Sequence, residues 1–296
     1  MSTAATHSRL WPLVADLLAL TKPRVTSLVM ATAAVGMGLA PSPIALPSAL
    51  AMLCATALLV GSANALNCWL ERDTDGFMQR TRERPLPAGR LEPQLAFAFA
   101  TALALTALPL LTLLVNPVTG LLGTVALFSY VWLYTPLKFK TPHALAIGAV
   151  PGALPPLMGW TAATGRIGAG GVLLFAIVFA WQMPHVIGLS SYRRSEYAAA
   201  GIRVLPLVRP ARVAQWHAIV WAALLLPISA ALWAIGLGGA LYLAAAVVLC
   251  ALYLGAALLG PLRPHEAIDR WGRRLFLVSL FYLPLLLLAL MLDKGA

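Results

Sequence analysis

The stretch Ser48-Ala-Leu-Ala-Met-Leu-Cys-Ala-Thr-Ala-Leu-Leu-Val-Gly-Ser-Ala-Asn-Ala-Leu-Asn67-Cys-Trp-Leu-Glu71-Arg-Asp-Thr-Asp75 joins a long apolar run to a ladder of polar side chains. The apolar run is long enough to cross a bilayer, which takes about 20 helical residues. Asn67, Glu71 and Asp75 follow at intervals of four, so at ~100° per residue they lie close to one helix face. Because polar groups at the end of a membrane helix are costly, the ladder predicts a functional site.

The composition of the chain predicts a polytopic all-α membrane protein. Hydrophobic residues make up 60% and charged residues 10% of the 296 residues, and the mean hydropathy is +0.84, outside the range of soluble domains. The apolar runs predict about nine transmembrane helices around a central cavity that faces the cytoplasm. The expected spans are 25–40, 48–69, 94–115, 118–135, 145–163, 168–189, 213–235, 239–260 and 274–292.

Residues 1–20 are expected to form a short cytoplasmic N-terminal tail, disordered over its first ten or so residues, and residues 21–293 a single intramembrane domain. The three cysteines have no paired spacing and are expected to be buried apolar residues without a redox role.

The basic residues predict the orientation. With nine spans, nineteen of the 21 lysines and arginines fall on the side of the N-terminus, and Arg166 and Lys294 fall on the other. The positive-inside rule therefore predicts a cytoplasmic N-terminus and an outside C-terminus. The cytoplasmic segments after the tail are 70–93, 136–144, 190–212 and 261–273. The net charge of +11 belongs to these segments, and no nucleic-acid partner is expected, because no aromatic residues interleave with the basic ones.

The ladder has the chemistry of a magnesium site next to a phosphate. Carboxylate and amide oxygens suit Mg²⁺, which in proteins usually lies between carboxylates and a phosphate-bearing substrate. The arginines at 80, 82 and 84 supply matching anion contacts. The alternative is a set of ordinary ion pairs at the end of an interfacial helix. Asn64 and Asn67 lie deeper than the carboxylates, where an amide in lipid needs a partner, and they favour the functional interpretation; Asp73 points off the ladder face and is interpreted as a structural charge.

Two further motifs carry candidate residues. Tyr134-Thr-Pro-Leu-Lys138 ends the fourth span, and Lys138 is either a positive-inside charge or an anion contact. Trp181-Gln-Met-Pro-His185 places a histidine in an apolar span. His185 could be a buried core residue whose hydrogen bonds are made within the protein. In a functional role it could be an axial haem ligand, a proton acceptor or a hydrogen-bond partner of a substrate. Glu196, early in the following cytoplasmic segment, is a candidate second metal ligand opposite the ladder.

Taken together, these motifs resemble the UbiA-type intramembrane prenyltransferases. Asn67-x-x-x-Glu71-x-x-x-Asp75 with Met78-x-Arg80-Thr-Arg-x-Arg84-Pro is similar to the first aspartate-rich motif of that family. The further matches, which extend the resemblance over residues 20–293, are Thr21-Lys22-Pro23-Arg24, Tyr134-Thr-x-x-Lys138, Gly148 to Gly152 with Pro155-Pro156 and Gly159-Trp160, Trp181-Gln-x-Pro-His185, Tyr197-x-x-Ala200-Gly201 and Phe276-x-x-Ser279-x-x-Tyr282-Leu-Pro284. Within the family, the similarity is to the members that use haem B.

The resemblance implies transfer of a farnesyl group from farnesyl diphosphate to a vinyl group of haem B, with addition of water, giving haem O. It implies Mg²⁺ as cofactor and a bacterial inner (plasma) membrane location. Besides the two substrates and the lipid bilayer, it implies haem A synthase or an oxidase-assembly protein as a partner. The implied residues are Asn67, Glu71, Asp75 and Glu196 for the metal, Arg80, Arg84, Lys138 and Arg193 for the diphosphate, and His185 for the haem; the ladder residues with Arg80 and Arg84 form the implied catalytic set.

Four positions depart from the family pattern. Glu71 and Glu196 stand where aspartate is frequent, Phe139 replaces a basic residue, and Val186 replaces a common phenylalanine. Two other functions stay open: prenyl transfer to an aromatic quinone precursor, and transport with the carboxylates as an ion-coupling site. His185 favours haem over a phenolic acceptor. The acidic residues cluster at the cytoplasmic end, whereas transporter sites lie near the midplane.

Overall fold

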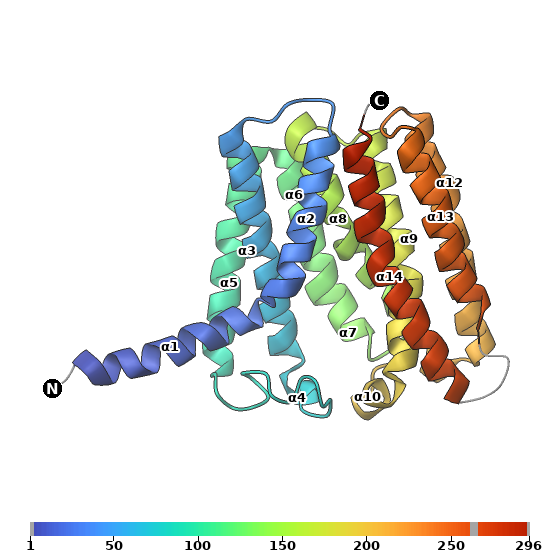
Figure 1. The fold of residues 1–296 in the computed structure, drawn as a ribbon. Helices are drawn as coiled ribbons and strands as arrows, with labels where there is room; N and C mark the ends of the chain where they lie inside the picture. The colour runs from blue at the N-terminus through green and yellow to red at the C-terminus, as the bar shows by residue number, and fades with distance from the viewer. Residues whose placement is uncertain (1–2, 261–265, 295–296) are drawn as a thin grey trace.

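The computed structural model describes residues 3–260 and 266–294, and within these ranges the chain forms only helices and connecting segments, with no strand (Figure 1). The long helices run side by side in a bundle, and short helices cover one end of it. The elements are α1 Thr3–Leu20, α2 Pro23–Leu39, α3 Leu46–Leu70, α4 Arg72–Asp75, α5 Pro93–Pro109, η1 Leu110–Val115, α6 Pro117–Phe128, η2 Ser129–Tyr134, α7 Thr135–Leu137, α8 Ala144–Thr164, α9 Ala169–Tyr192, α10 Arg194–Ala199, α11 Leu205–Val208, α12 Ala211–Ala234, α13 Ala240–Leu258 and α14 Glu266–Leu292.

The helices match the predicted spans. In the described part of the chain, eight helical runs are long and apolar enough to cross a membrane. They are α3, α5 with η1, α6 with η2 and α7, α8, α9, α12, α13 and α14. The remaining predicted span is α2, a shorter helix of 17 residues that packs against α8 and α3. A bundle of about nine membrane helices is therefore confirmed.

Two boundaries differ from the prediction. α14 begins at Glu266, so most of the segment 261–273 is helix rather than loop, and residues 261–265, with Arg263, lie outside the described residues. α1 begins at Thr3, so the expected disorder of the first ten or so residues is wrong for the described part. Apolar residues at helical spacing explain this second difference: Leu13, Leu17 and Leu20 pack against α3 and α5.

Glycines allow two pairs of helices to approach closely. A β-carbon at Gly36 of α2 would collide with the Pro156 carbonyl of α8, and one at Gly159 of α8 would collide with the Ala33 carbonyl of α2. Small residues at such crossings let backbones pack directly where no hydrophobic driving force separates helix from lipid. α9 and α14 meet in the same way, with Gly188 next to the Gly272 carbonyl.

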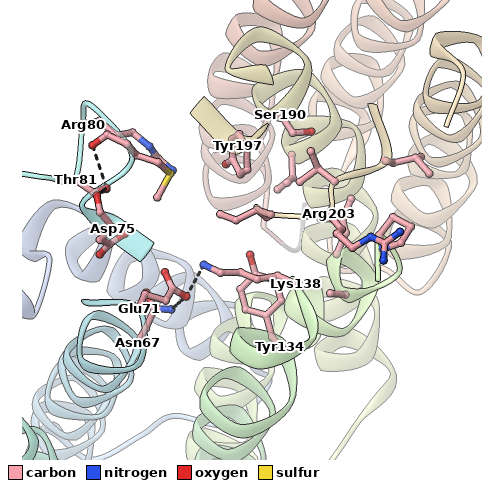
Figure 2. A pocket seen from close by; sticks show the side chains of 18 of the residues that line it. Asn67, Glu71, Asp75, Arg80, Thr81, Tyr134, Lys138, Ser190, Tyr197 and Arg203 are labelled. Atoms are coloured by element: carbon pink, nitrogen blue, oxygen red, sulfur yellow. Dashed lines mark hydrogen bonds and ion pairs between the residues drawn. The ribbon is translucent and has the colours of Figure 1, made fainter. Parts of the chain in front are cut away.

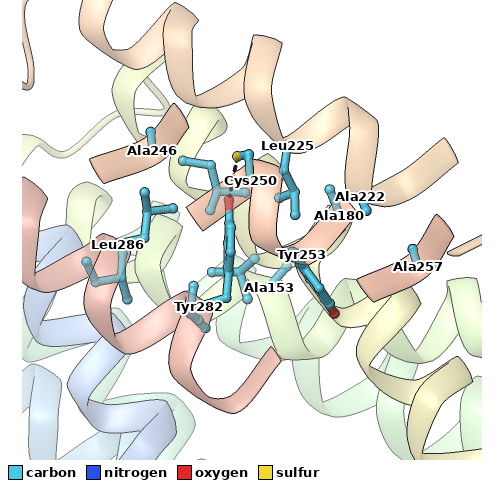
Figure 3. Packing of buried hydrophobic residues seen from close by; sticks show 14 of the residues in the cluster. Ala153, Ala180, Ala222, Leu225, Ala246, Cys250, Tyr253, Ala257, Tyr282 and Leu286 are labelled. Carbon is cyan, nitrogen blue, oxygen red and sulfur yellow. Dashed lines mark hydrogen bonds between the residues drawn. The ribbon is translucent and has the colours of Figure 1, made fainter. Parts of the chain in front are cut away.

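Two apolar cores lie on either side of the bundle. One joins α3, η1, α6 and α8, and the other joins α9, α12, α13 and α14. In the second core, alanines bring the helices together and tyrosines fill the space between them (Figure 3). The Tyr282 hydroxyl lies 3.3 Å from Cys250 Sγ, so this buried polar group has a partner. Cys68 and Cys250 are buried as expected, whereas Cys54 is exposed and that expectation is wrong.

The end of the fourth span is a π-helix. Pro136 has no N–H to donate, which breaks the regular ladder of backbone hydrogen bonds. The six residues Ser129–Tyr134 form η2, and the Thr135 hydroxyl donates to the Tyr130 carbonyl at 2.9 Å. Such π-helical turns frequently occur at functional sites. Here the irregular turn aims Tyr130 and Tyr134 into the interior of the bundle.

Replacing Gly36 by leucine should destabilise the fold by more than the ~1–3 kcal/mol typical of core overpacking, because the new side chain meets backbone rather than a movable side chain. The measurement is the fraction of purified protein that stays monodisperse after heating. Gly255→Leu on α13 is the control, since a β-carbon there meets nothing within 4 Å. Equal thermal resistance of the two variants would contradict the close α2–α8 contact.

Candidate functional site at the end of the bundle

A polar cavity of about 170 Å³ lies at the end of the bundle that carries α4 and α10. Its walls come from the end of α3, the segment after α4, the η2–α7 turn, α9 and the segment from α10 to α11. Figure 2 shows Glu71 and Lys138 pointing toward one another from opposite walls. The residues that line it and were predicted from sequence are Asn67, Glu71, Asp75, Arg80, Arg84 and Lys138.

The ladder forms one wall, as its spacing predicted. Asn67 is in the last turn of α3, Glu71 joins α3 to α4, and Asp75 ends α4. The amide N–H of Glu71 donates to the Asn67 carbonyl at 3.0 Å, and that of Asp75 donates to the Glu71 carbonyl at 2.8 Å. The four-residue repeat is therefore continuous across the junction. The three side chains are only 3%, 4% and 0% exposed, whereas the side chain of Asp73 is 84% exposed and points away.

Each ladder carboxylate has a basic partner. Lys138 Nζ forms an ion pair with Glu71 Oε1, and Arg84 Nη1 donates to Asp75 Oδ2 at 2.6 Å. Burial opposes the charge on Arg84, but nearby anionic groups, among them the Asp75 carboxylate, raise its pKa overall. A buried carboxylate without such a partner would be strongly destabilising.

Asn67 is held from both sides. Its Nδ2 donates to Glu71 Oε1 and, at 3.3 Å, to Thr135 Oγ1. Its Oδ1 accepts from Lys22 Nζ at 3.0 Å. The backbone of Lys22 is in the left-handed region, with φ 50°, which is a strained conformation for a residue with a side chain. Burial lowers the pKa of the Lys22 ammonium group. No role was predicted for Lys22 from the sequence; the need of the deep Asn67 amide for a partner shows that a partner exists but does not say which residue supplies it.

Glu196 lies behind the opposite wall of the cavity. Its carboxylate pairs with Arg193 at 2.7 Å and with Arg80 at 3.6 Å. Arg80 also lies over the Tyr197 ring at 5.8 Å. Arg80 lines the cavity, whereas Glu196 and Arg193 do not. Glu196 and Arg193 therefore lie one side chain behind the cavity wall. Arg80 therefore links the segment after α4 to α10 across the mouth of the cavity.

The side chains of the cavity provide some, but not all, of the ligands that a metal ion would need. Within residues 3–260 and 266–294, no three His, Cys, Asp or Glu side chains form a cluster that could hold a metal ion by themselves. Two buried carboxylate oxygens nevertheless have no hydrogen-bond partner: Asp75 Oδ1 and Glu196 Oε2. Hard oxygen donors of this kind suit Mg²⁺. The donor set therefore fits a metal that arrives with other ligands rather than one held by the protein alone.

Phe139 occupies the place where a basic residue was expected. It packs against Met78, Ala200 and Ile202, and its ring lies 5.3 Å from Lys138 Nζ. The Phe139 ring thus packs next to the Lys138 ammonium group. Its apolar contacts also connect the segment after α4 with the segment after α10.

A larger apolar cavity of about 390 Å³ adjoins the polar one deeper in the bundle. Four residues line both cavities: Tyr130, Tyr134, Leu145 and Val186. The other walls come from α2, α3 and α8 and from Trp181 and Gln182 of α9. The site thus combines a charged head pocket with an apolar chamber. Tyr130, which the sequence analysis did not single out, lies at their junction because η2 turns it inward.

His185 is near these cavities but lines neither of them in the described structure. Its ring stacks on Trp181 at 4.7 Å and lies 5.0 Å from the Phe276 ring of α14. Its Nδ1 is 2.7 Å from the Ser279 hydroxyl. The neighbouring residues Trp181 and Val186 line the apolar cavity, so the imidazole is one side chain away from it.

The chain matches the model of the UbiA prenyltransferase family over residues 29–291. It is 47% identical to a protoheme IX farnesyltransferase of Anaeromyxobacter sp. (strain Fw109-5), covering 94% of this chain and 93% of the relative. It is 49% identical to the protoheme IX farnesyltransferase of Myxococcus xanthus (strain DK1622), covering 94% of each chain.

Solved structures share the fold. One of digeranylgeranylglyceryl phosphate synthase has a TM-score of 0.81 at 16% identity, covering 95% of this chain and 98% of that chain. A UbiA homologue from Archaeoglobus fulgidus, bound to GPP and Mg²⁺, has a TM-score of 0.67 at 16% identity, covering 92% of this chain and 99% of that chain.

Fold and site thus define an integral membrane enzyme of the prenyltransferase class, built as an all-helical bundle with a charged cavity at one end. The chain belongs to the UbiA prenyltransferase family, and its curated relatives place it among the protoheme IX farnesyltransferases of that family.

Replacing Arg84 by leucine should lower the free energy of unfolding by up to about 3 kcal/mol, because Asp75 is fully buried and Arg84 is its ion-pair partner. The loss should be measured as the shift in the thermal transition of the purified protein. Arg82→Leu is the matched control, since among the described residues Arg82 forms its one ion pair with the exposed Glu83, at 4.0 Å. In an Asp75→Asn background, Arg84→Leu should have a much smaller effect; an unchanged effect would contradict the pairing.

Proposed function

We propose that this protein transfers the farnesyl group of farnesyl diphosphate to a vinyl group of haem B, with addition of water, and so makes haem O. The observation that carries the proposal is the junction of a charged cavity with an apolar chamber at Tyr130 and Tyr134. This arrangement matches a substrate with a diphosphate head and an apolar tail. The relatives named protoheme IX farnesyltransferase support haem B over an aromatic quinone precursor as acceptor.

The diphosphate would bind among the basic residues of the polar cavity. Arg80, Arg84 and Lys138 line it, and Arg193 lies just behind Arg80. In the described structure, all four of these cations pair with carboxylates: Lys138 with Glu71, Arg84 with Asp75, and both Arg80 and Arg193 with Glu196. A bound diphosphate would be a second anionic partner for these cations. Their positive charge would stabilise the negative charge that develops on the diphosphate as the C–O bond breaks.

A magnesium ion would be held by Asp75 and Glu196, whose carboxylates each keep an oxygen without a hydrogen bond, and by Glu71 and Asn67 once Lys138 and Lys22 turn to the diphosphate. Such an ion neutralises charge on the diphosphate leaving group. Since no three acidic, histidine or cysteine side chains converge in the described part of the chain, we infer that metal and diphosphate bind together. The Archaeoglobus fulgidus homologue, which has the same fold, holds GPP and Mg²⁺.

The reaction joins the farnesyl C1 atom to a vinyl carbon of haem B. The C1–O bond breaks and diphosphate leaves with its electron pair. The vinyl carbon supplies the electrons of the new C–C bond, and water adds to the resulting cation with loss of a proton. The apolar chamber would take the farnesyl tail and keep bulk water away from the allylic cation. His185, beside this chamber, would bind the haem.

We further propose the bacterial inner membrane as the location, with the charged cavity and the N-terminus on the cytoplasmic side, because the basic residues gather at that end. An enzyme that consumes haem O, such as haem A synthase, or an oxidase-assembly protein would then be a neighbouring partner.

Membranes of a host that lacks haem O should contain haem O when they carry this protein and not when they carry Asp75→Asn or Glu71→Gln. The measurement is reversed-phase separation of extracted haems with mass detection. Asp73→Asn is the matched control and should keep full activity, because Asp73 is exposed and lies off the cavity wall. Haem B alone, with wild-type protein verified in the membrane, would refute the function; full activity of Glu71→Gln would refute the site.

Filling the apolar chamber should alter the preferred chain length. Val60 lines the chamber. Val60→Trp should therefore reduce turnover of farnesyl diphosphate about tenfold or more relative to turnover of the shorter geranyl diphosphate. The reason is that the larger side chain destabilises binding of the longer tail by the ~1–3 kcal/mol typical of overpacking. Val125→Trp on the exposed face of α6 is the control. An unchanged ratio of the two rates would place the prenyl tail elsewhere.

A further inference from the structure

The apolar chamber contains a side-chain carboxamide whose orientation is fixed. Gln182 of α9 lines the chamber and is half-buried. Its Nε2 donates to the Ala149 carbonyl of α8 and to the Val178 carbonyl of α9, each at 3.2 Å. A carboxamide nitrogen has two N–H groups, so both are used. In the described part of the chain no group donates to Gln182 Oε1, yet this atom is not among the fully buried atoms without a partner. It is therefore an acceptor that is open to the chamber.

Gly152 of α8 leaves the room for this carboxamide. A β-carbon at position 152 would lie 2.1 Å from Gln182 Oε1 and 2.9 Å from Gln182 Cδ, so any side chain there would displace the end of Gln182. Of the other chamber-lining side chains from α8 and α9, one carries an N–H group: Trp181, whose Nε1 donates to the Ser279 carbonyl at 2.8 Å. Gln182 thus places a held acceptor oxygen on an otherwise apolar wall.

The polar side chains that α2 and α3 contribute to the chamber are held less firmly. Asn64 Nδ2 makes one hydrogen bond in the described structure, to the Thr21 carbonyl at 3.1 Å. The hydroxyls of Thr32 and Thr56 each donate within their own helix. A hydroxyl group rotates to donate or to accept, and the same holds for the tyrosines at the junction of the two cavities. Gln182 is therefore the side chain best fixed to orient a water molecule.

The proposed reaction needs one water at one carbon. Formation of the C–C bond leaves positive charge on the other vinyl carbon, about 2.5 Å from the farnesyl C1 atom by ordinary bond geometry. C1 would lie at the junction of the two cavities, because the diphosphate would bind in one and the farnesyl tail in the other. Val186 lines both cavities, and Gln182 lies one helical turn, about 6 Å, deeper on the same face of α9.

We propose that Gln182 Oε1 holds the water that adds to the vinyl-derived cation. A water that donates to this oxygen turns its own lone pairs away from the carboxamide, as attack on a cation requires. One lone pair of the water forms the new C–O bond, and the proton that is lost goes to the departed diphosphate. This proposal rests on the proposed function, and it makes Gln182 a positioning residue for the hydration step.

The fate of the cation without a held water gives the test its readout. The cation would then lose a proton from the carbon newly bonded to C1, with diphosphate again as the base, and give an alkene. This alkene is lighter than haem O by one water. The ratio of haem O to the alkene therefore reports on the positioning of water, whereas a general loss of stability or of substrate binding lowers both products together.

The purified full-length protein in detergent would be given haem B, farnesyl diphosphate and Mg²⁺, and the haems separated by reversed-phase chromatography with mass detection. Gln182→Met has a side chain of similar length without hydrogen-bonding groups. It should lower the ratio of haem O to alkene about tenfold, as expected for loss of one oriented hydrogen bond. Gly152→Ala keeps Gln182 but displaces its carboxamide, and it should shift the ratio in the same direction.

Gln215→Met is the matched control. Gln215 Nε2 also donates to two backbone carbonyls, those of Ala257 at 3.3 Å and Leu258 at 3.0 Å. Because Gln215 lines neither cavity in the described structure, its replacement removes a link of the same kind between helices without touching the chamber. The ratio of haem O to alkene should stay at the wild-type value.

The outcomes separate this role from the proposed function. If the wild type makes haem O and either Gln182→Met or Gly152→Ala prenylates haem B with the wild-type ratio of products, the role of Gln182 is refuted and the proposed function stands. An equal shift in Gln215→Met would also refute it, because the ratio would then follow helix packing. If the wild type forms no prenylated haem, the proposed function fails and the role of Gln182 fails with it.

Discussion

The pairing of buried carboxylates with cations at one end of the bundle is the interaction on which the site depends. Glu71 with Lys138 and Glu196 with Arg80 each join two different segments, and Asp75 with Arg84 closes the segment 70–93 on itself. A charge buried in this position without a partner would cost several kcal/mol. These pairs therefore hold the segments after α4 and α10 over the cavity, although exposed pairs of the same type contribute little.

The same ion pairs would exchange partners when the substrate binds. A diphosphate with a divalent cation presents both signs of charge, so it offers each carboxylate and each arginine or lysine a new partner at once. The exchange keeps every buried charge neutralised, whereas a metal or a diphosphate alone would leave one set unmatched. Rigid helices position the groups: α3 fixes the ladder, and the π-helix before Pro136 places Tyr134 and Lys138 opposite it.

The fold and one wall of the site follow from the sequence, because apolar runs and a four-residue repeat are local properties. Asn67, Glu71 and Asp75 line the cavity as their spacing predicted. What sequence could not reveal depends on contacts between distant segments: Lys22 reaches Asn67 across 45 residues, and Glu196 lies behind Arg80. The helix over the first residues was missed because they are polar, whereas the leucines that pack α1 against α3 and α5 come later, at Leu13, Leu17 and Leu20.

Joint binding of metal and diphosphate, which we propose above, can be measured by Mn²⁺ electron paramagnetic resonance. Purified protein would be titrated with Mn²⁺ in place of Mg²⁺, with and without a farnesyl thiodiphosphate that resists cleavage. We expect at least about tenfold tighter Mn²⁺ binding with the analogue, with phosphorus coupling to the bound ion, and loss of this gain in Asp75→Asn. Equally tight binding of Mn²⁺ without the analogue would contradict it.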